Sequence, residues 1–425
     1  MLEIKNGNVI DPVSGTIEVR DIFIQNGCIV SKTGSRPEKT IDASGFYVAP
    51  GLVDIHVHFR DPGYEYKEDI YSGALAAAAG GFTTVACMAN TNPVLDSPEL
   101  IEYVLNKSSK TDINVFPIAA VTKGQRGECL TDFGALKGAG ACALSDDGVP
   151  VSNAGLMLEA LRAAGGLGLI IVSHSEDAHM TDGRAVNEGS ISQRLDIGGR
   201  PSVAEEYMVA RDAMLAEYAG AGIHIAHVST AGSVDIIREF KKRGVNISCE
   251  TCPQYFTFTQ EEVLKKGAMA KVFPPLRTER DREAVIAGLC DGTIDIIASD
   301  HAPHSSEEKA LGLADAPGGM IGLETSLAAA LSALYHTGRM PLAEIIRKMT
   351  VNPSNRLNLP AGGIAIGDRA DLVIFDLDRE WIVNSDKFHS KSRNTPFSGM
   401  KLKGRVEFTI SGGKVVYQSD NSRFS

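Results

Sequence analysis

Eight short apolar runs, separated by stretches with helical character, constrain this chain more than any other feature of its sequence. Runs of this length without polar alternation are typical of parallel strands that are buried on both faces. They cover residues 52–57, 82–88, 113–119, 141–144, 169–173, 223–228, 245–249 and 294–298. The helical stretches between or after them include residues 71–79, 155–164, 204–219, 233–243, 280–289 and 326–335. Eight such units predict an α/β fold, a closed (β/α)₈ TIM-like barrel.

The two ends of the chain have a different pattern. Residues 2–5, 17–24 and 28–31, and later 370–375, 406–410 and 414–417, are β-rich, and Asn26-Gly27 and Gly412-Gly413 are turn signals. We therefore expect a small β-sandwich formed by both chain ends, residues 1–50 and 359–425, with the barrel in residues 51–358. A doubly wound open sheet is the main alternative, but no Gly-rich dinucleotide fingerprint follows the first apolar run.

Charge and composition exclude several classes of function. The chain has 42 basic and 53 acidic residues, a net charge of −11, and no basic run longer than the three residues 241–243, which argues against nucleic-acid binding. Its start lacks a signal-peptide pattern, and no apolar stretch approaches the ~20 residues of a membrane span. The seven cysteines are scattered, as expected in a reducing compartment. We expect a cytoplasmic protein.

Most of the histidines lie at the carboxyl ends of the predicted barrel strands. In this fold the residues at the carboxyl ends of the strands face the active site. A single histidine there is more often a hydrogen-bonded core residue than a ligand, but coincidence across four strands is a poor explanation. Together with nearby Asp residues such a set predicts a borderline divalent ion such as Zn²⁺. Six of the ten histidines lie at or just beyond predicted strand ends: His56, His58, His174, His227, His301 and His304. The other four are interpreted as structural.

These residues also carry a resemblance. The segment V-D-I-H-V-H-F-R-D-P-G at residues 53–63, with His174, His227 and Asp300, resembles the amidohydrolase superfamily, and within it the bacterial, monofunctional, long-chain dihydroorotases. The likeness extends almost from end to end, through GGFTT at 80–84, MANTNPV at 88–94, PPLR at 274–277, DGTID at 291–295, DHAPH at 300–304 and NTPF at 394–397.

The resemblance implies a set of metal ligands. His56, His58 and Asp300 would hold one Zn²⁺, and His174 and His227 a second, so that one or two ions are expected per chain. Asp147 would bridge them, although the adjacent Asp146 is distinguished from it only by the family match. Many relatives bridge with a carboxylated lysine. Ala143 to Asp147 contains no lysine, which speaks against hydantoinases, dihydropyrimidinases and allantoinases.

The resemblance also implies the reaction, the reversible cyclisation of N-carbamoyl-L-aspartate to L-dihydroorotate in pyrimidine (UMP) biosynthesis. Asp300 would be the catalytic residue that transfers the proton. Arg60, Asn90 and His304 would hold the substrate carboxylate, for which the Arg fork suits better than Lys. The full set of expected substrate-binding residues is His58, Arg60, Asn90, His304, Gly318, Gly319 and Phe273.

Two departures from the family pattern bear on the substrate contacts. Phe273 stands where many relatives have Asn, and Gly318-Gly319 stands where many have Phe-Gly. Two alternatives are therefore kept open: another cyclic amidohydrolase of the allantoinase or dihydropyrimidinase type, and a non-catalytic homologue that acts as a scaffold for aspartate transcarbamoylase. A homo-oligomer is expected, and aspartate transcarbamoylase is the candidate protein partner.

Overall fold

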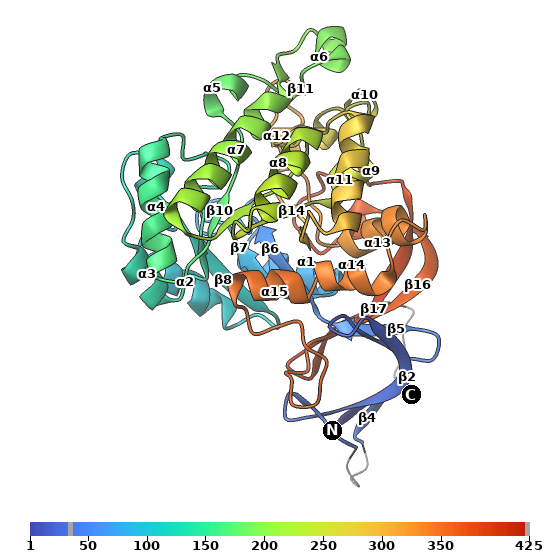
Figure 1. Ribbon diagram of the computed structural model, residues 1–425. Helices are drawn as coiled ribbons and strands as arrows, with labels where there is room; N and C mark the ends of the chain where they lie inside the picture. Colours follow the sequence, from blue (N-terminus) through green and yellow to red (C-terminus); the bar gives the residue numbers. More distant parts are fainter. Residues whose placement is uncertain (33–36, 421–425) are drawn as a thin grey trace.

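Eight parallel strands form the centre of the molecule (Figure 1). The computed structural model describes residues 1–32 and 37–420. Each predicted apolar run overlaps one strand of this sheet, and neighbours in the sheet are neighbours in sequence, as the barrel prediction requires. The strands are β6 (Leu52–Val57), β7 (Phe82–Cys87), β8 (Asn114–Ala119), β9 (Ala143–Leu144), β10 (Ile171–Ser173), β13 (Ile223–Ile225), β14 (Ile247–Thr251) and β15 (Ile296–Ile297).

The sheet closes almost completely on itself. Val57, at the end of the first barrel strand, forms a parallel bridge with His301, just beyond the last one. The backbone N–H of His58 donates to the carbonyl oxygen of His301 over 2.8 Å. The α/β barrel expected from the sequence is confirmed, and its closure brings the first and eighth strand ends together.

Helices cover the outside of the barrel, and their ends show why they form there. Thr230 caps α8 by accepting from the N–H of Ser233, and Thr278 caps α11 through a reciprocal box with Asp281. Gly220 ends α7 at φ 63°, a conformation that favours glycine. All six predicted helical stretches are confirmed. The covering helices are α1 (Ile70–Ala79), α2 (Pro98–Ser108), α3 (Phe133–Ala139), α4 (Ala154–Gly166), α7 (Ser202–Ala219), α8 (Ala231–Lys242), α11 (Glu279–Asp291), α13 (Ser326–Ala330, continued as a π-helix over Leu331–Tyr335), α14 (Leu342–Lys348) and α15 (Val351–Leu357).

Short elements surround the end of the barrel at which the strands finish, at the top of Figure 1. The longest excursion joins β10 to α7 and projects from the molecule. It contains α5 (Ala178–Thr181), β11 (Val186–Asn187), α6 (Ser190–Leu195) and β12 (Gly199–Arg200), with β11 and β12 paired in parallel. Two further excursions contain α9 (Pro253–Thr257), α10 (Glu262–Lys266) and α12 (Ser306–Lys309).

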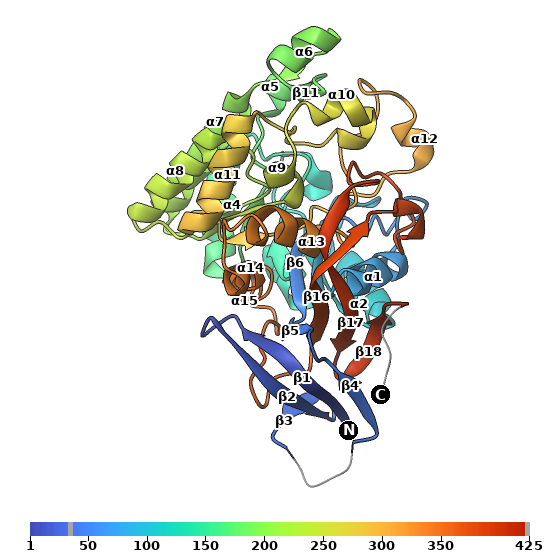
Figure 2. The same ribbon diagram turned by 90° about the vertical axis from the view of Figure 1, so that its right-hand side faces the viewer.

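Both chain ends contribute to one eight-stranded mixed sheet, below the barrel in Figure 2. The six predicted terminal strands are confirmed, and two short ones, β4 and β5, were not predicted. The division of the chain at residues 50 and 358 into separate units stays a prediction. The strands are β1 (Leu2–Asp11), β2 (Thr16–Gln25), β3 (Cys28–Val30), β4 (Lys39–Asp42), β5 (Tyr47–Pro50), β16 (Leu372–Ile382), β17 (Lys401–Ser411) and β18 (Lys414–Gln418).

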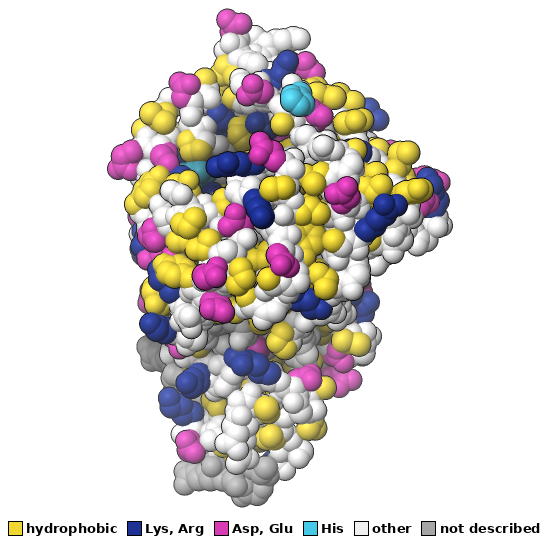
Figure 3. Space-filling model, turned by 90° about the vertical axis from the view of Figure 1, so that its left-hand side faces the viewer, with side chains coloured by type: hydrophobic (Ala, Val, Ile, Leu, Met, Phe, Trp, Pro, Cys, Tyr) yellow, Lys and Arg dark blue, Asp and Glu magenta, His cyan; other side chains and the backbone are white. Residues whose placement is uncertain are grey.

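The face of the molecule drawn in Figure 3 has no large patch of a single charge. Figure 3 shows basic and acidic side chains interspersed with apolar ones over one face of the molecule. Among the helices of residues 1–32 and 37–420, none combines the length and apolar character needed to cross a membrane.

Candidate metal centre and active site

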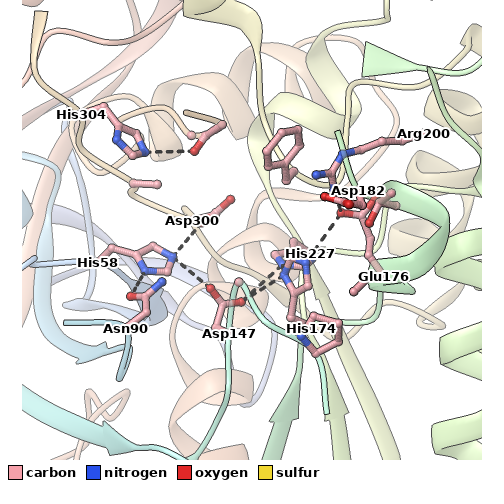
Figure 4. A pocket seen from close by; sticks show the side chains of 18 of the residues that line it. His58, Asn90, Asp147, His174, Glu176, Asp182, Arg200, His227, Asp300 and His304 are labelled. Atoms are coloured by element: carbon pink, nitrogen blue, oxygen red, sulfur yellow. Dashed lines mark hydrogen bonds and ion pairs between the residues drawn. The ribbon is translucent and has the colours of Figure 1, made fainter. Parts of the chain in front are cut away.

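The carboxylate of Asp147 lies at the centre of a group of four histidines, three of which, His58, His174 and His227, are labelled around it in Figure 4. Its Oδ1 atom lies 3.4 Å from His174 Nδ1 and 3.5 Å from both His56 Nε2 and His227 Nε2. Its Oδ2 atom lies 3.5 Å from His58 Nε2. Two of the histidines lie at the end of β6, and the other side chains follow β9, β10 and β13, so the closure of the barrel brings them together.

Two overlapping groups in this cluster have the composition of metal sites. One is His56, His58 and Asp147, and the other is Asp147, His174 and His227; in each, the ligand atoms lie within 4.8 Å of one another. Asp147 belongs to both groups, which is the arrangement that a bridging carboxylate needs. Asp300 Oδ1 approaches the first group, 3.2 Å from His58 Nε2 and 3.6 Å from His56 Nε2.

The buried polar atoms of the cluster indicate that a cation fits there. Among the described residues, His56 Nε2 and Asp147 Oδ1 are buried without a hydrogen-bond partner, which is costly for polar atoms unless something else binds them. Burial lowers the pKa of His174, but Asp147 and Glu176 raise it overall to about 9. Carboxylates that draw protons onto buried imidazoles would also favour a divalent ion, so the donor set fits Zn²⁺.

A buried relay of polar side chains orients His56 from behind. Its Nδ1 atom lies 2.5 Å from Glu250 Oε1, and Glu250 Oε2 lies 3.2 Å from His224 Nε2. Ser248 Oγ completes the relay, 2.7 Å from His224 Nδ1. Burial alone would raise the pKa of Glu250, but His56 and His224 hold it at about 2. An ionised carboxylate at Nδ1 leaves Nε2 of His56 directed at the metal groups, as supporting carboxylates do in metal sites.

The two adjacent aspartates have different environments. Asp146 Oδ1 accepts hydrogen bonds from the backbone N–H groups of Val121 (2.8 Å) and Thr122 (3.1 Å), and its Oδ2 accepts from the Thr122 hydroxyl. Asp146 is thereby held by the turn after β8, while Asp147 faces the histidines. The geometry favours Asp147 as the bridging residue.

Three residues of the site have a left-handed backbone. The φ angles are 61° at Arg60, 36° at His227 and 47° at Asp300. Residues other than glycine seldom adopt positive φ, and such strain is concentrated at functional sites. Each of these residues turns out of a strand end so that its side chain reaches the cavity.

The expected carboxylate-binding residues lie on one side of the metal groups. Arg60 Nη2 lies 3.4 Å from His304 Nε2, and Asn90 Oδ1 lies 2.8 Å from His58 Nδ1. Arg60 Nε donates to the carbonyl oxygen of Pro303 (3.2 Å), and no ion pair to Arg60 occurs within the described part of the chain. Burial and the Arg60 cation hold the pKa of His304 below its ordinary value, so that ring is neutral and Arg60 supplies the positive charge.

The unusual residues Phe273, Gly318 and Gly319 line the same cavity, whose volume is about 360 Å³. A Cβ at Gly318 would lie 2.6 Å from Phe273 Cδ2, and one at Gly319 would lie 2.9 Å from the Cβ of Ala302. Phe273 therefore takes the room that a side chain at position 318 would need. The two departures noted in the sequence are one coupled change in packing.

Sequence reasoning missed several residues of this site. His224 and Glu250 lie within β13 and β14, and a charged residue in an otherwise uncharged strand is the signal that could have revealed Glu250. Glu176 and Arg200 line the cavity on the side away from His58, and nothing in their sequence neighbourhood marks them. Every expected ligand and substrate-binding residue except His56 lines the cavity, and His56 lies beside it against Asp147.

Comparison with known proteins agrees with this geometry. A family model described as "Dihydro-orotase-like" matches residues 45–233, and an amidohydrolase family model matches residues 216–417. The chain is 52% identical over 421 residues to the dihydroorotase of Ruminiclostridium cellulolyticum, covering 98% of both chains. It is 50% identical over 424 residues to that of Citrifermentans bemidjiense, covering 98% of this chain and all of the relative.

Solved structures show the same architecture. An L-hydantoinase (dihydropyrimidinase) from Arthrobacter aurescens superposes with a TM-score of 0.88 at 26% identity, covering 99% of this chain and 97% of that one. A D-hydantoinase superposes with a TM-score of 0.87, also at 26% identity, covering 100% and 96%. The hydantoinases share the fold at low identity, whereas the relatives with about half of their residues identical are dihydroorotases. With its buried His and Asp cluster and its end-to-end similarity to them, the chain belongs to the dihydroorotase family of cyclic amidohydrolases.

Proposed function

We propose that this chain interconverts N-carbamoyl-L-aspartate and L-dihydroorotate, as a step in pyrimidine biosynthesis. One observation carries the substrate assignment. Arg60, which has no carboxylate partner among the described residues, lies beside the two groups of potential metal ligands. These two groups share Asp147, where many relatives have a lysine. A cyclic amide that carries a free carboxylate on its ring matches that arrangement, whereas allantoin and dihydrouracil have no carboxylate.

The proposed cofactor is Zn²⁺, one or two ions per chain. His56, His58 and Asp300 would hold one ion, His174 and His227 the other, and Asp147 would bridge them. Bound there, the metal would act as a Lewis acid that polarises the amide carbonyl and makes water reactive near neutral pH.

Asp300 is the proposed catalytic residue. Its carboxylate lines the cavity next to His58, where it can accept a proton from attacking water and return it to the ring nitrogen that leaves during ring opening. Ring closure uses the same group in reverse. Among the described residues, Asp147 is the one other carboxylate beside both His56 and His58, and the histidines enclose it.

Arg60, Asn90 and His304 are proposed to hold the α-carboxylate. The Arg60 guanidinium would donate two parallel hydrogen bonds, a geometry that fits carboxylates. His304 is fixed for this role because its Nε2 atom lies 3.0 Å from the carbonyl oxygen of Gly318 and its backbone N–H donates to Asn394 Oδ1 over 3.1 Å. Held in this way, the substrate presents its side-chain end to Asp300 and the metals.

A direct assay tests the proposal. Purified protein should turn over L-dihydroorotate and N-carbamoyl-L-aspartate but neither allantoin nor dihydrouracil. Metal analysis of the same sample should find one or two zinc ions per chain, and chelation should abolish turnover. Zinc-loaded protein that is inactive on dihydroorotate but active on another cyclic amide would refute the substrate assignment. A homo-oligomer, an aspartate transcarbamoylase partner and a cytoplasmic location stay predictions from the sequence.

A further inference from the structure

The wall of the cavity opposite Arg60 holds a second arginine. Arg200 belongs to β12, in the excursion between β10 and α7, and in Figure 4 it lies with Glu176 across Asp147 from His58 and His304. Its side chain is 13% exposed and lines the cavity. The two guanidinium groups thus approach the metal groups from opposite sides.

Contacts on several sides fix the guanidinium of Arg200. Its Nη1 donates to Glu176 Oε2 over 2.7 Å, and its Nε donates to the carbonyl oxygen of Arg184 over 2.9 Å. Its Cζ lies 3.4 Å from the centre of the Phe273 ring, as in a stacked cation–π pair. The backbone is tied as well, since Arg277 Nη1 donates to the carbonyl oxygen of Arg200 over 3.0 Å.

Phe273 is held in turn, so that it provides a rigid platform. The absence of a side chain at Gly318 makes the room for its ring. On the chain that follows, the carbonyl oxygen of Pro274 accepts a hydrogen bond from the Tyr255 hydroxyl over 2.8 Å. The stacked guanidinium therefore has one orientation, which is what a specific hydrogen bond to a ligand requires.

The charges on the two walls differ, and this difference indicates what each arginine binds. Arg60 has no carboxylate partner within residues 1–32 and 37–420, so it suits an anion. Arg200 is already paired with Glu176, which is 1% exposed. Arg277 lies 3.8 Å from Glu176 as well, but Glu205, 3.5 Å from Arg277, balances its charge, so the group as a whole presents no net charge to the cavity. Among the described residues, Nη2 of Arg200 makes no hydrogen bond. A neutral pair with a free N–H donor suits a neutral carbonyl oxygen better than a second carboxylate.

We propose that Arg200, held flat against Phe273, donates a hydrogen bond from Nη2 to the ureido carbonyl oxygen of the substrate and so determines specificity at that end. This inference rests on the proposed function, because the ureido group is the part of N-carbamoyl-L-aspartate that the α-carboxylate site does not reach. The same carbonyl is present in dihydroorotate and takes no part in the bond that forms or breaks.

A contact made equally in substrate and product stabilises the bound ground state and the transition state alike. Its loss should raise KM and leave kcat nearly unchanged. Arg200→Met should therefore raise KM at least ~10-fold in both directions, the scale of one charge-assisted hydrogen bond, while kcat changes less than about threefold. Inhibition by succinate, which has the carbon skeleton and both carboxylates but no ureido group, should be unaffected.

Two further variants separate binding from structure. Arg200→Lys keeps a positive charge beside Glu176 but loses the flat guanidinium, so zinc content and Tm should match wild type while KM rises. Arg184→Met is the matched control, because Arg184 Nη1 ties the same excursion through the carbonyl oxygen of Gly199 (2.9 Å) without lining the cavity. Its KM should equal that of wild type.

The platform is tested by Phe273→Leu, which removes the aromatic face and should raise KM about three- to tenfold, the scale of a cation–π contact. In the Arg200→Met background the same change should have little effect. An unchanged KM in both Arg200 variants would overturn the inference. So would a loss of activity in these variants that parallels a loss of zinc, or a weakening of succinate inhibition as large as the weakening of substrate binding. These outcomes all presuppose an active wild type. Wild-type protein inactive on both compounds would instead refute the proposed function itself.

Discussion

The terminal sheet and the mouth of the barrel both contain residues in the left-handed backbone region, but for different reasons. In the sheet they are Asn6 at φ 58° and Asn26 at φ 51°, each followed by glycine in a turn or bulge. At the mouth they are Arg60, His227 and Asp300. Of these, His227 at 36° and Asp300 at 47° fall below the usual left-handed range of about +50° to +70°.

The difference indicates that the left-handed residues serve folding in the sheet and the active site at the mouth. Asparagine tolerates the left-handed region, so the sheet uses it at the turn between β2 and β3, at Asn26, and at the bulge within β1, at Asn6. At the mouth, the three residues with this backbone, Arg60, His227 and Asp300, all line the cavity. Substitutions in the sheet should therefore change stability, and substitutions at the mouth should change turnover.

The largest expected effect is that of Asp300→Asn. Turnover should fall by ~10²-fold or more, the scale of a lost proton transfer, whereas Tm should not fall because asparagine accepts positive φ well. Zinc content must be measured on the same sample, since Asp300 is also a proposed ligand. The matched control is Asp196→Asn, an exposed aspartate at φ 53° away from the site, which should change neither quantity. Near-normal turnover of Asp300→Asn at full zinc loading would contradict the assigned role.

Arg60→Lys tests the mouth of the barrel more finely, because lysine keeps the positive charge but lacks the two parallel N–H donors of the guanidinium. We expect kcat/KM for dihydroorotate to fall ~10- to 100-fold, corresponding to about 1.5–3 kcal/mol for a charge-assisted hydrogen bond. Tm should stay within a few degrees of wild type. Steady-state kinetics and thermal melts test both expectations, and an unchanged kcat/KM would mean that the carboxylate is bound elsewhere.

Asn26→Ala tests the other side of the comparison. A residue with a Cβ and no amide in the left-handed region should lower the free energy of unfolding by about 1–2 kcal/mol and leave kcat/KM unchanged. Asn26→Gly should have little effect, because glycine adopts this conformation freely. Denaturant unfolding of the three proteins measures the difference. Reduced activity in Asn26→Ala at full folding would break the separation between the two regions.

A further effect concerns pH, at a contact between the barrel chain and the segment that joins β16 to β17. Burial raises the pKa of Glu324 to about 8, although its Oε1 accepts from the backbone N–H groups of His389 (2.9 Å) and Ser390 (3.2 Å). A carboxyl whose pKa is raised in the folded state is protonated there while the unfolded chain is ionised, so its contribution to stability is lost as pH rises from about 5 to 8.

Glu324→Gln keeps the accepting oxygen and removes the titration. Relative to wild type, its free energy of unfolding should gain about 1.4 kcal/mol for each pH unit between pH 5 and pH 8, so a few kcal/mol over that window. Unfolding measured at both pH values in parallel tests this, and an identical pH dependence for the two proteins would show that Glu324 does not titrate as described.

The sequence predicts the parts of this molecule that depend on local pattern. The barrel strands are continuous apolar runs, and the histidines at their ends are neighbours only because parallel strands finish at one edge. The relay behind His56 could not be predicted, since Glu250 and His224 meet through the register of β13 and β14. Arg200 was missed because β12 has two residues and no periodicity. Likewise, β4 and β5 are short and depend on pairing with β1.

The position of β5 in the terminal sheet, between β1 and β16, has a consequence for synthesis on the ribosome. Pro50 is made long before Leu372, its partner across that edge, and at 5–20 residues per second the wait lasts roughly a quarter of a minute to a minute. During that time the nascent chain carries an open β edge, a template for pairing with other chains. The barrel can assemble in the interval, so the last strands to emerge close the edge that the first ones leave open. Truncated products that stop before β16 would keep that edge and should aggregate.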